Sequence, residues 1–500
     1  MRLASPSPGS FASRSDRHNP ADRRCPRVVF TIMRNVCTFT DDALGDLDAV
    51  GMVDALRTGR VSPLDLVGAA IARAEAVNPA LNGLAYNMFD RARALAQPGR
   101  SAGFFAGVPT FVKDNVDIEA APSMDGTDAW APAAKTANSE VVNVLLAVGL
   151  NPIGKSHLSE FGFSAAAEHP RLGPVRNPWD TDFTTGASSA GSAAFVAAGV
   201  VPVAHANDGG GSIRIPAACS GLVGLKPSQG RLPMDTMTRK MPVRLVSEGM
   251  LTRSVRDTAA FYREAELQWR NRSLPPIGAV NGPGTERLRI AVLTKSVASD
   301  CSPRIRDSTL DTAALLTDLG HRVEILDENP IPESFLGDFL LYWASLAMAV
   351  VLTGRRTFGP SFDVGRLDNL TRGLDRHARR NLHRIPVAVA RLRRIRRVTA
   401  RLYQDYDVLL TPTLTHETPP VGFLDPMADY EQIVDRLIGW VGFTPLQNVT
   451  GEPAISLPLA QSATGMPIGM MFSAAFGSDG LLLKLAYELE QARSFPRISG

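Results

Sequence analysis

Three consecutive glycines that end on a serine, Gly209–Gly211 and Ser212, form the stretch of this sequence best suited to chemistry. Glycine allows other groups to approach the backbone closely, so a run of glycines lets several N–H groups converge on one point. Converging N–H groups stabilise the negative oxygen that develops during acyl transfer. Ser212 is therefore predicted to be a nucleophile.

A serine hydroxyl is a weak nucleophile until a base removes its proton, and histidine is the usual base. None of the histidines lies in a recognisable base motif, and His205, in an apolar segment, is predicted to be a structural strand residue. A buried lysine can replace histidine, because burial disfavours the charged ammonium and lowers the lysine pKa. Lys113 follows an apolar run at 108–112 and is a candidate base. The residues alone leave open an alternative role for it, an ion pair with Asp114 or Asp117.

Two other patterns nearby do not meet the structural requirements of their motifs. Residues 149–156 match the phosphate-binding pattern G-x-x-x-x-G-K-[ST]. A phosphate loop needs a strand before it and a helix after it, whereas here a helix is predicted before the first glycine and a strand from Ile153. Residues 186–190 depart from the G-x-S-x-G nucleophile elbow at the last position, Ala190. We therefore expect no nucleotide site at 149–156.

Helices and strands alternate along most of the chain. Ser62 and Pro63 predict a helix start, because serine caps the first N–H groups and proline fits the first turn. Helices are predicted at 62–78, 139–148, 192–199, 308–320 and 481–493, and strands at 104–112, 200–206, 222–226, 288–293, 321–326 and 405–413. This alternation predicts an α/β fold with helices on both faces of the sheet.

Residues of about 330–405 differ in character from the rest. The apolar run 335–352 is borderline in length for a membrane span. We predict a buried or pocket-lining helix there, with a peripheral membrane contact as the alternative. The arginine-rich segment Arg372–Arg401 is predicted to be a solvated helix face, with an anionic partner as the alternative.

Composition narrows the class of protein. The chain has 500 residues and a formal charge of +3, which gives no case for nucleic-acid binding. The four cysteines are too few and too scattered for a disulfide framework or a metal site, which favours the cytoplasm. Residues 1–35 are predicted to be a disordered extension or an incorrectly assigned start, since Met33 is a second candidate start. A single domain is expected over 36–500, with a mostly helical, substrate-shaping region at about 330–405.

Several motifs occur together, in order, that resemble those of the amidase signature family. They are Gly107–Asn115, Gly154–Lys155, Gly186–Ser192, Asp208–Ala217, Gly221–Ser228 and Gly451–Pro458. The resemblance covers roughly residues 40–495, and residues 206–216 are similar to the branch that includes 6-aminohexanoate cyclic dimer hydrolases. It implies the amidase-signature fold, a large, mixed, twisted β-sheet core covered by helices on both faces.

The resemblance also implies a Ser–cis-Ser–Lys triad. Ser212 would be the nucleophile, Lys113 the base, and Ser188, after a cis peptide bond with Ala187, the proton relay between them. The backbone N–H groups of the oxyanion hole would belong to Gly209, Gly210, Gly211 and Ser212, and the supporting residues would be Ser189, Asp208 and Arg214. The family commonly has glycine where this chain has Ala187 and Ala190, and threonine where it has Asn207.

The activity implied by the resemblance is hydrolysis of a carboxamide C–N bond, in a linear or cyclic amide, through an acyl-enzyme on Ser212. The products would be a carboxylate and an amine or ammonia. No metal or cofactor is expected, the partner is a small-molecule amide, and a homodimer is compatible with the family. Four aromatic residues in the apolar run favour an apolar acyl or amine group: Phe335, Phe339, Tyr342 and Trp343.

Two alternatives stay open. One is the amidase subunit of a tRNA-dependent glutamine amidotransferase, for which Arg372–Arg401 is the only feature that suggests an RNA partner. The other is a peripheral membrane or scaffold protein that kept the fold and lost catalysis. The presence of Lys113, Ser188 and Ser212 argues against this second alternative.

Overall fold

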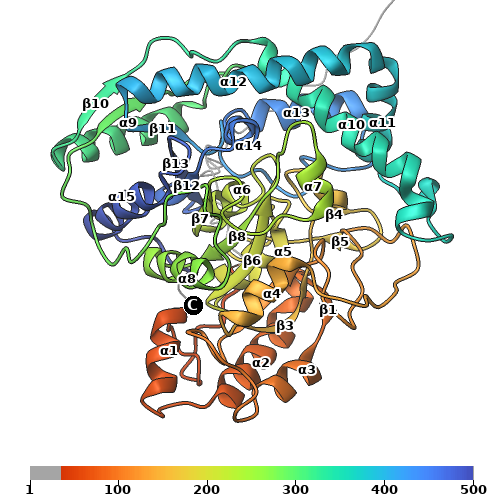
Figure 1. The fold of residues 1–500 in the computed structure, drawn as a ribbon, viewed down its shortest axis with the longest axis vertical. Helices are drawn as coiled ribbons and strands as arrows, with labels where there is room; N and C mark the ends of the chain where they lie inside the picture. Colours follow the sequence, from red (N-terminus) through yellow and green to blue (C-terminus); the bar gives the residue numbers. More distant parts are fainter. Residues whose placement is uncertain (1–34, 499–500) are drawn as a thin grey trace, which may run out of the picture. The chain divides into compact units, whose positions relative to one another are not determined.

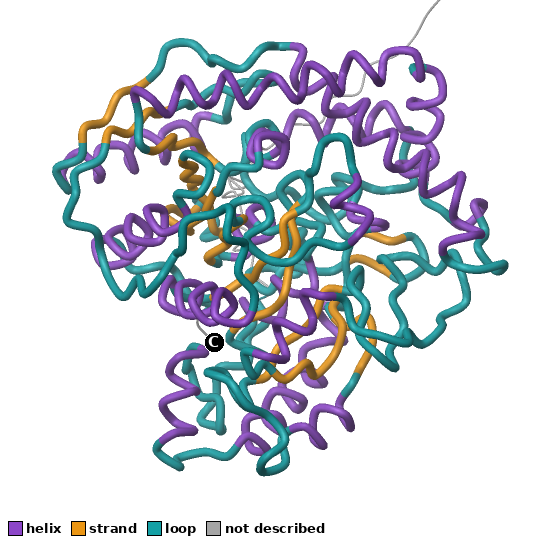
Figure 2. The backbone as a smooth tube through the Cα atoms, in the orientation of Figure 1, coloured by secondary structure: helices purple, strands orange, loops and turns teal. Residues whose placement is uncertain are grey.

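The computed structural model describes residues 35–498, drawn in colour in Figure 1. The predicted disordered extension at 1–35 therefore lies, except for Asn35, outside the described residues. The described chain is a mixed α/β structure, and Figure 2 shows its strands running through the middle with helices around them.

An eight-stranded sheet is the main element of the fold. Its strand order is β10-β9-β11-β13-β12-β7-β8-β6. The strands are β6 (Val203–Asp208), β7 (Val223–Lys226), β8 (Ser247–Thr252), β9 (Arg289–Val292), β10 (Arg322–Ile325), β11 (Val408–Pro412), β12 (Ala454–Gln461) and β13 (Pro467–Ala474). The pairs β10–β9 and β11–β9 are parallel and the others antiparallel, so the sheet is mixed, as predicted.

A smaller sheet of three strands carries Lys113. Its order is β1 (Leu84–Asn87), β3 (Asn151–Ser156) and β2 (Pro109–Lys113), and β2 packs against β6 of the large sheet. Two short strands, β4 (Glu168–His169) and β5 (Gly173–Pro174), form a separate hairpin. The contact between β2 and β6 brings the end of one sheet to the edge strand of the other, and the candidate site is built there.

Helices cover the sheets. Helix α6 (Arg214–Ser220) packs on β7, β12 and β13, whereas α8 (Val255–Gln268) packs on β7 and β8. The remaining helices outside 330–405 are α1 (Ala49–Arg57), α2 (Pro63–Leu81), α3 (Phe89–Leu95), α4 (Glu140–Ala147), α5 (Ala190–Ala197), α7 (Thr236–Lys240), α9 (Pro303–Asp318), α13 (Tyr430–Trp440), α14 (Pro445–Thr450) and α15 (Asp479–Ala492).

Helix α2 shows where sequence signals located a boundary and where they did not. Ser62 caps the helix start as predicted, because Asp65 N–H donates to Ser62 Oγ and Ser62 N–H donates to the Asp65 carboxylate, 2.9 Å away. The predicted end at residue 78 is wrong, since the helix continues through Pro79 to Leu81. The helix ends after Leu81, where the capping residue Asn82 has a left-handed φ of 54°.

The region 330–405 is helical and forms one edge of the structure. It contains α10 (Ser334–Thr357), α11 (Asn369–Arg380) and α12 (Ile385–Asp405), and α10 packs against both others. Among the described residues, α10 is the one helix long and apolar enough by composition to cross a membrane, and only 33% of its most apolar window is buried.

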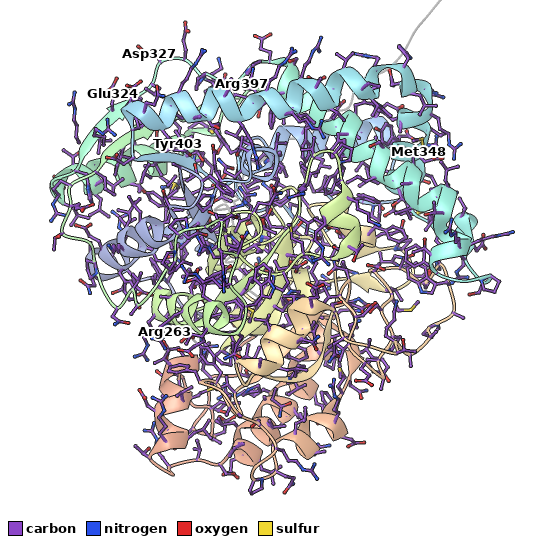
Figure 3. All side chains as sticks on the ribbon, viewed as in Figure 1. Arg263, Glu324, Asp327, Met348, Arg397 and Tyr403 are labelled. Carbon is purple, nitrogen blue, oxygen red and sulfur yellow. The ribbon has the colours of Figure 1, made fainter. Side chains whose placement is uncertain are left out.

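Helix α12 has an inner face and an outer face. Tyr403 donates a hydrogen bond from its hydroxyl to Ser473 Oγ of β13, 3.1 Å away, whereas Arg397 is exposed at the outer edge in Figure 3. Arg393 and Arg394 are exposed in the same way. This exposure agrees with the predicted solvated helix face, and an anionic partner for it stays a prediction.

The start of α5 lies tightly against the small sheet. Gly191 N–H donates to His157 O, and His157 N–H donates to Gly83 O. A Cβ atom on Gly191 would overlap Gly83 O and lie 2.7 Å from His157 N, so both neighbours are backbone atoms that cannot rotate away. The crowded position of this segment is therefore Gly191 and not the neighbouring Ala190, whose methyl group is buried without such a clash.

We expect Gly191→Ala to lower the free energy of unfolding by about 1–3 kcal/mol, the usual cost of forcing extra atoms into a packed interior. The matched control is Gly68→Ala in α2, where nothing lies within 4 Å of the added Cβ. That change should raise stability by up to about 1 kcal/mol through helix propensity. Urea unfolding followed by circular dichroism measures both. Equal stability of Gly191→Ala and the wild type would contradict the close packing described here.

Candidate active site

Lys113 is the last residue of β2 and is fully buried. Its Nζ lies 2.7 Å from Ser188 Oγ, 2.7 Å from Asn207 Oδ1 and 3.3 Å from Asn207 O. The peptide bond between Ala187 and Ser188 is cis, as the family resemblance implied. The structure thus brings together two of the three predicted triad residues through a direct hydrogen bond.

The protonation of Lys113 is set mainly by its burial. Burial lowers the pKa of Lys113 to about 7, although the nearby carboxylates of Glu248, Asp208 and Asp125 favour the charged ammonium. A large share of Lys113 is consequently a neutral amine near pH 7, the form that can accept a proton.

The structure rejects the ion pairs that the sequence left open for Lys113. Asp114 pairs instead with Lys155, 2.7 Å away, and Asp117 pairs with Lys135, 3.2 Å away. Lys155 also donates to Pro122 O, so this lysine of the phosphate-loop pattern is a buried structural residue on β3. The prediction that 149–156 is no phosphate loop is confirmed, because helix α4 precedes it and the segment 151–156 is a strand.

The glycine turn is held in shape by Asp208. Strand β6 ends at Asp208, and its carboxylate accepts hydrogen bonds from Gly211 N–H at 2.7 Å and Ile213 N–H at 3.1 Å. Because Gly211 N–H already donates to Asp208, it is not available to an oxyanion. The backbone N–H groups of Gly209, Gly210 and Ser212 remain as the predicted donors. The turn leads directly into α6, which begins at Arg214.

Asp208 and Arg214 form a buried ion pair under the turn. Arg214 donates to Asp208 from Nε at 2.9 Å and from Nη2 at 3.0 Å, and Asn448 Nδ2 adds a third donor at 2.8 Å. Burial by itself would raise the pKa of Asp208, but Arg214 and these hydrogen bonds hold it well below its ordinary value. Arg214 also donates to Gln447 Oε1 and Asn448 Oδ1, so the supporting roles predicted for Asp208 and Arg214 involve residues of α14 as well.

Ser212 lines an apolar cavity of about 550 Å³, a volume that includes its opening to solvent. The walls come from the glycine turn, the loop at 162–165, α10 and α13. The lining residues are Gly162, Phe163, Ser164, Ala165, Ala187, Gly210, Ser212, Ile215, Leu336, Phe339, Leu340, Trp343, Leu437, Ile438, Val441 and Pro445. None of these lining residues, all within the described chain, carries a charge.

Aromatic side chains of α10 form the wall closest to the glycine turn. Trp343 stacks on Phe339 with ring centroids 5.6 Å apart and meets Phe163 edge-on at 5.5 Å. A Cβ atom on Gly209 would lie 3.3 Å from the Trp343 ring, so the helix packs directly against the turn. Of the four predicted aromatic residues, Phe339 and Trp343 line the cavity.

The other two aromatic residues face elsewhere. Phe335 lines a neighbouring cavity, and Tyr342 is bound through its hydroxyl to the backbone of Val243. The sequence could not show which of the four aromatic residues line the cavity, because it does not show which face of the helix is turned toward the cavity.

Sequence reasoning missed most of the polar contacts around Lys113, including those of Asn115 and Glu248, although it named Ser189 as a supporting residue. Asn115 and Asn207 exchange hydrogen bonds between their amides, and Ser189 Oγ donates to Asn207 O at 3.3 Å. His205 is a buried strand residue as predicted, and it also accepts a hydrogen bond from Lys113 N–H and contacts Glu248 at 2.9 Å. Strand alternation would have placed residues 205 and 207 on one face, but nothing in the sequence showed that β2 lies against that face.

Comparison with known proteins agrees with this geometry. A sequence model of the Amidase family matches residues 65–483. The chain belongs to the amidase family. AmiC of Mycobacterium leprae, a protein assigned to the amidases by its name, is 64% identical over 466 residues, which are 93% of this chain and 99% of AmiC.

Two further comparisons concern 6-aminohexanoate cyclic dimer hydrolases. The 6-aminohexanoate-cyclic-dimer hydrolase of Paenarthrobacter ureafaciens is 32% identical, over 89% of this chain and 94% of that protein. A solved structure of a 6-aminohexanoate cyclic dimer hydrolase superimposes with a TM-score of 0.82 at 29% identity, covering 91% of this chain and 98% of that one. The predicted family, α/β fold and amidohydrolase class are confirmed.

We expect Arg214→Met to lower the free energy of unfolding by about 3–5 kcal/mol, because it leaves the Asp208 carboxylate buried without its partner. The exposed pair of Arg239 and Glu140, 2.8 Å apart, provides the control. Arg239→Met should change stability by less than about 1 kcal/mol, as is usual for surface pairs. Chemical denaturation measures both variants, and similar losses in the two would show that the buried pair does not hold the turn.

Proposed function

We propose that this amidase hydrolyses uncharged, apolar carboxamides, with Ser212 as nucleophile, Ser188 as proton relay and Lys113 as base. The observation that carries the proposal is the 2.7 Å contact of the buried Lys113 amine with Ser188 Oγ, next to the cavity that contains Ser212. A neutral amine in that position can accept a proton, which an exposed lysine at the same pH cannot do.

The proposed reaction begins with transfer of the Ser212 proton to Ser188 and of the Ser188 proton to Lys113. Ser212 Oγ attacks the amide carbon, and the backbone N–H groups of Gly209, Gly210 and Ser212 stabilise the oxyanion. The C–N bond then breaks as the proton on Lys113 returns, through Ser188, to the leaving nitrogen. Water attacks the resulting ester on Ser212 by the same proton route and releases the carboxylate.

The cavity walls support the choice of substrate class. A carboxylate or ammonium group in this cavity would lose its hydration and find no charged partner, which costs several kcal/mol. Glutamine carries both groups near its amide, so the glutamine amidotransferase alternative is disfavoured. An aryl, arylalkyl or aliphatic group would instead be buried against Leu340 and Trp343 of α10. We therefore also propose that the region 330–405 determines substrate selectivity.

We also propose a cytoplasmic location. Cys37, Cys219 and Cys301 are free thiols, and Cys219 is fully buried. Free thiols at three separate places are typical of proteins that work in a reducing compartment.

We expect Ser212→Ala to lower kcat/KM by about 10⁴-fold or more, because the acyl-enzyme can no longer form. A fluorophosphonate probe should label the wild type on the peptide that contains Ser212, and mass spectrometry identifies the site. The control is Ser273→Ala, at an exposed serine whose hydroxyl donates a hydrogen bond to Asn271 Oδ1. Full activity of Ser212→Ala with an unchanged thermal melting curve would contradict the proposed mechanism.

A substrate panel tests the proposed specificity. It contains an aryl amide, a linear aliphatic amide, a cyclic diamide and glutamine, and release of amine or ammonia is the readout. We expect kcat/KM to be at least about 100-fold higher for the best apolar amide than for glutamine, since each 1.4 kcal/mol corresponds to a factor of ten. A preference for glutamine would contradict the assignment drawn from the cavity walls.

A further inference from the structure

The amine of Lys113 has three polar neighbouring atoms, which differ in whether they can donate a hydrogen bond. Two are carbonyl oxygens of one residue, Asn207 Oδ1 at 2.7 Å and Asn207 O at 3.3 Å. The third is Ser188 Oγ at 2.7 Å, which can both donate and accept. A neutral primary amine has two N–H donors and one lone pair, so its three positions match three neighbours.

Because the Asn207 oxygens can only accept, they take the two N–H groups of a neutral Lys113. The lone pair is then the one position left to meet the Ser188 hydroxyl proton. We propose that Asn207 is a positioning residue that directs the Lys113 lone pair toward Ser188, and that Asn115 fixes Asn207 in the required orientation. This inference rests on the proposed function, in which Lys113 is the base.

Asn115 determines which end of the Asn207 amide faces the lysine. Asn207 Nδ2 donates to Asn115 Oδ1 at 3.0 Å, and Asn115 Nδ2 donates to Asn207 Oδ1 at 3.3 Å. A flipped Asn207 would place its NH₂ group against the Lys113 N–H groups and its oxygen against Asn115 Oδ1. Two unfavourable contacts therefore oppose the flip, and the acceptor oxygen stays on Lys113.

The strand framework holds the rest of the lysine. His205 and Asn207 are two positions apart on β6 and so point to the same face, toward β2. His205 Nδ1 accepts a hydrogen bond from Lys113 N–H at 3.3 Å, and its Nε2 lies 2.9 Å from Glu248 on β8. Asn207 lies opposite Glu248 in the β6–β8 register. The backbone of Lys113 is thus fixed by His205 while its amine is fixed by Asn207.

The charged groups that act on Lys113 from the neighbouring elements are few. They are the carboxylates of Glu248 on β8, Asp208 on β6 and Asp125 in the loop after β2. On the adjacent strand β3, Lys155 is already paired with Asp114. Asn207 Oδ1 lies 2.7 Å from the amine, within hydrogen-bond distance, so replacing its amide by a carboxylate should have a clear electrostatic effect.

The test is the pH dependence of kcat/KM for a neutral amide substrate in the wild type and in Asn207→Asp. In the wild type the rate should rise with pH through about 7, as Lys113 loses its proton. A carboxylate at position 207 favours the ammonium, so the rising limb should move to higher pH by about one unit or more. This shift tests the close contact between residue 207 and the Lys113 amine, because the introduced charge acts only at short range. An unmoved limb would show that residue 207 does not contact the amine.

Two smaller variants separate orientation from charge. Asn207→Ala should lower kcat by about 100-fold with KM within about twofold, the scale expected when a reacting group is misplaced by about an ångström. Asn115→Ala should lower kcat in the same direction, because Asn207 is then free to flip. The matched control is Asn143→Ala, which breaks an exposed Asn138–Asn143 contact of 3.1 Å and should leave kcat and the pH profile unchanged.

The outcomes distinguish this inference from the function on which it rests. If Lys113→Ala abolishes activity but Asn207→Asp keeps the wild-type pH limb, the positioning role is wrong and the proposed base stands. If Lys113→Ala keeps full activity, the proposed mechanism itself fails. Should Asn207→Asp not fold, Asn115→Ala decides, since wild-type kcat in that folded variant would overturn the proposal.

Discussion

The site depends on keeping one lysine out of water without giving it a carboxylate partner. Burial alone favours the neutral amine, and a bonded aspartate would reverse that preference. The protein avoids the reversal by satisfying the nearby acids elsewhere, Asp114 with Lys155 and Asp117 with Lys135. Lys113 is left with neutral oxygens, so two buried lysines on adjacent strands have different partners: Lys155 is paired with a carboxylate, whereas Lys113 contacts a hydroxyl and carbonyl oxygens.

Helix α10 links the proposed substrate cavity to the glycine turn. Helix α10 belongs to a region far from the catalytic motifs in sequence, yet its Trp343 ring packs directly on the glycine turn at Gly209. The aromatic wall of the cavity therefore also packs against the backbone proposed to stabilise the oxyanion. Changing this helix to suit a new substrate alters the environment of the turn, because both functions share one side chain.

Sequence reasoning identified the candidate reacting groups better than their surroundings. Lys113, Ser188 and Ser212 were predicted from motifs, and the α/β alternation located β6, β7, β9, β10 and β11 to within about three residues. Strands β8, β12 and β13 of the same sheet were not predicted. The Asn115–Asn207 pair was missed because it depends on the packing of the small sheet against the large one. The Glu248–His205 contact was missed because it joins β6 and β8, and the sequence did not predict β8 or its pairing with β6. The sequence also did not show that Gly211 N–H is unavailable as an oxyanion donor, because the Asp208 side chain reaches Gly211 only in the folded turn.

The contact of Arg214 with Gln447 and Asn448 spans more than 230 positions of the chain. The nucleophile turn is therefore completed by residues that leave the ribosome long after it. A nascent chain that already contains the three reacting residues still lacks the amides that fix Asp208 and Arg214. The complete turn therefore forms only after Gln447 and Asn448 have been synthesised, so the order of folding at the site differs from the order of its motifs along the chain.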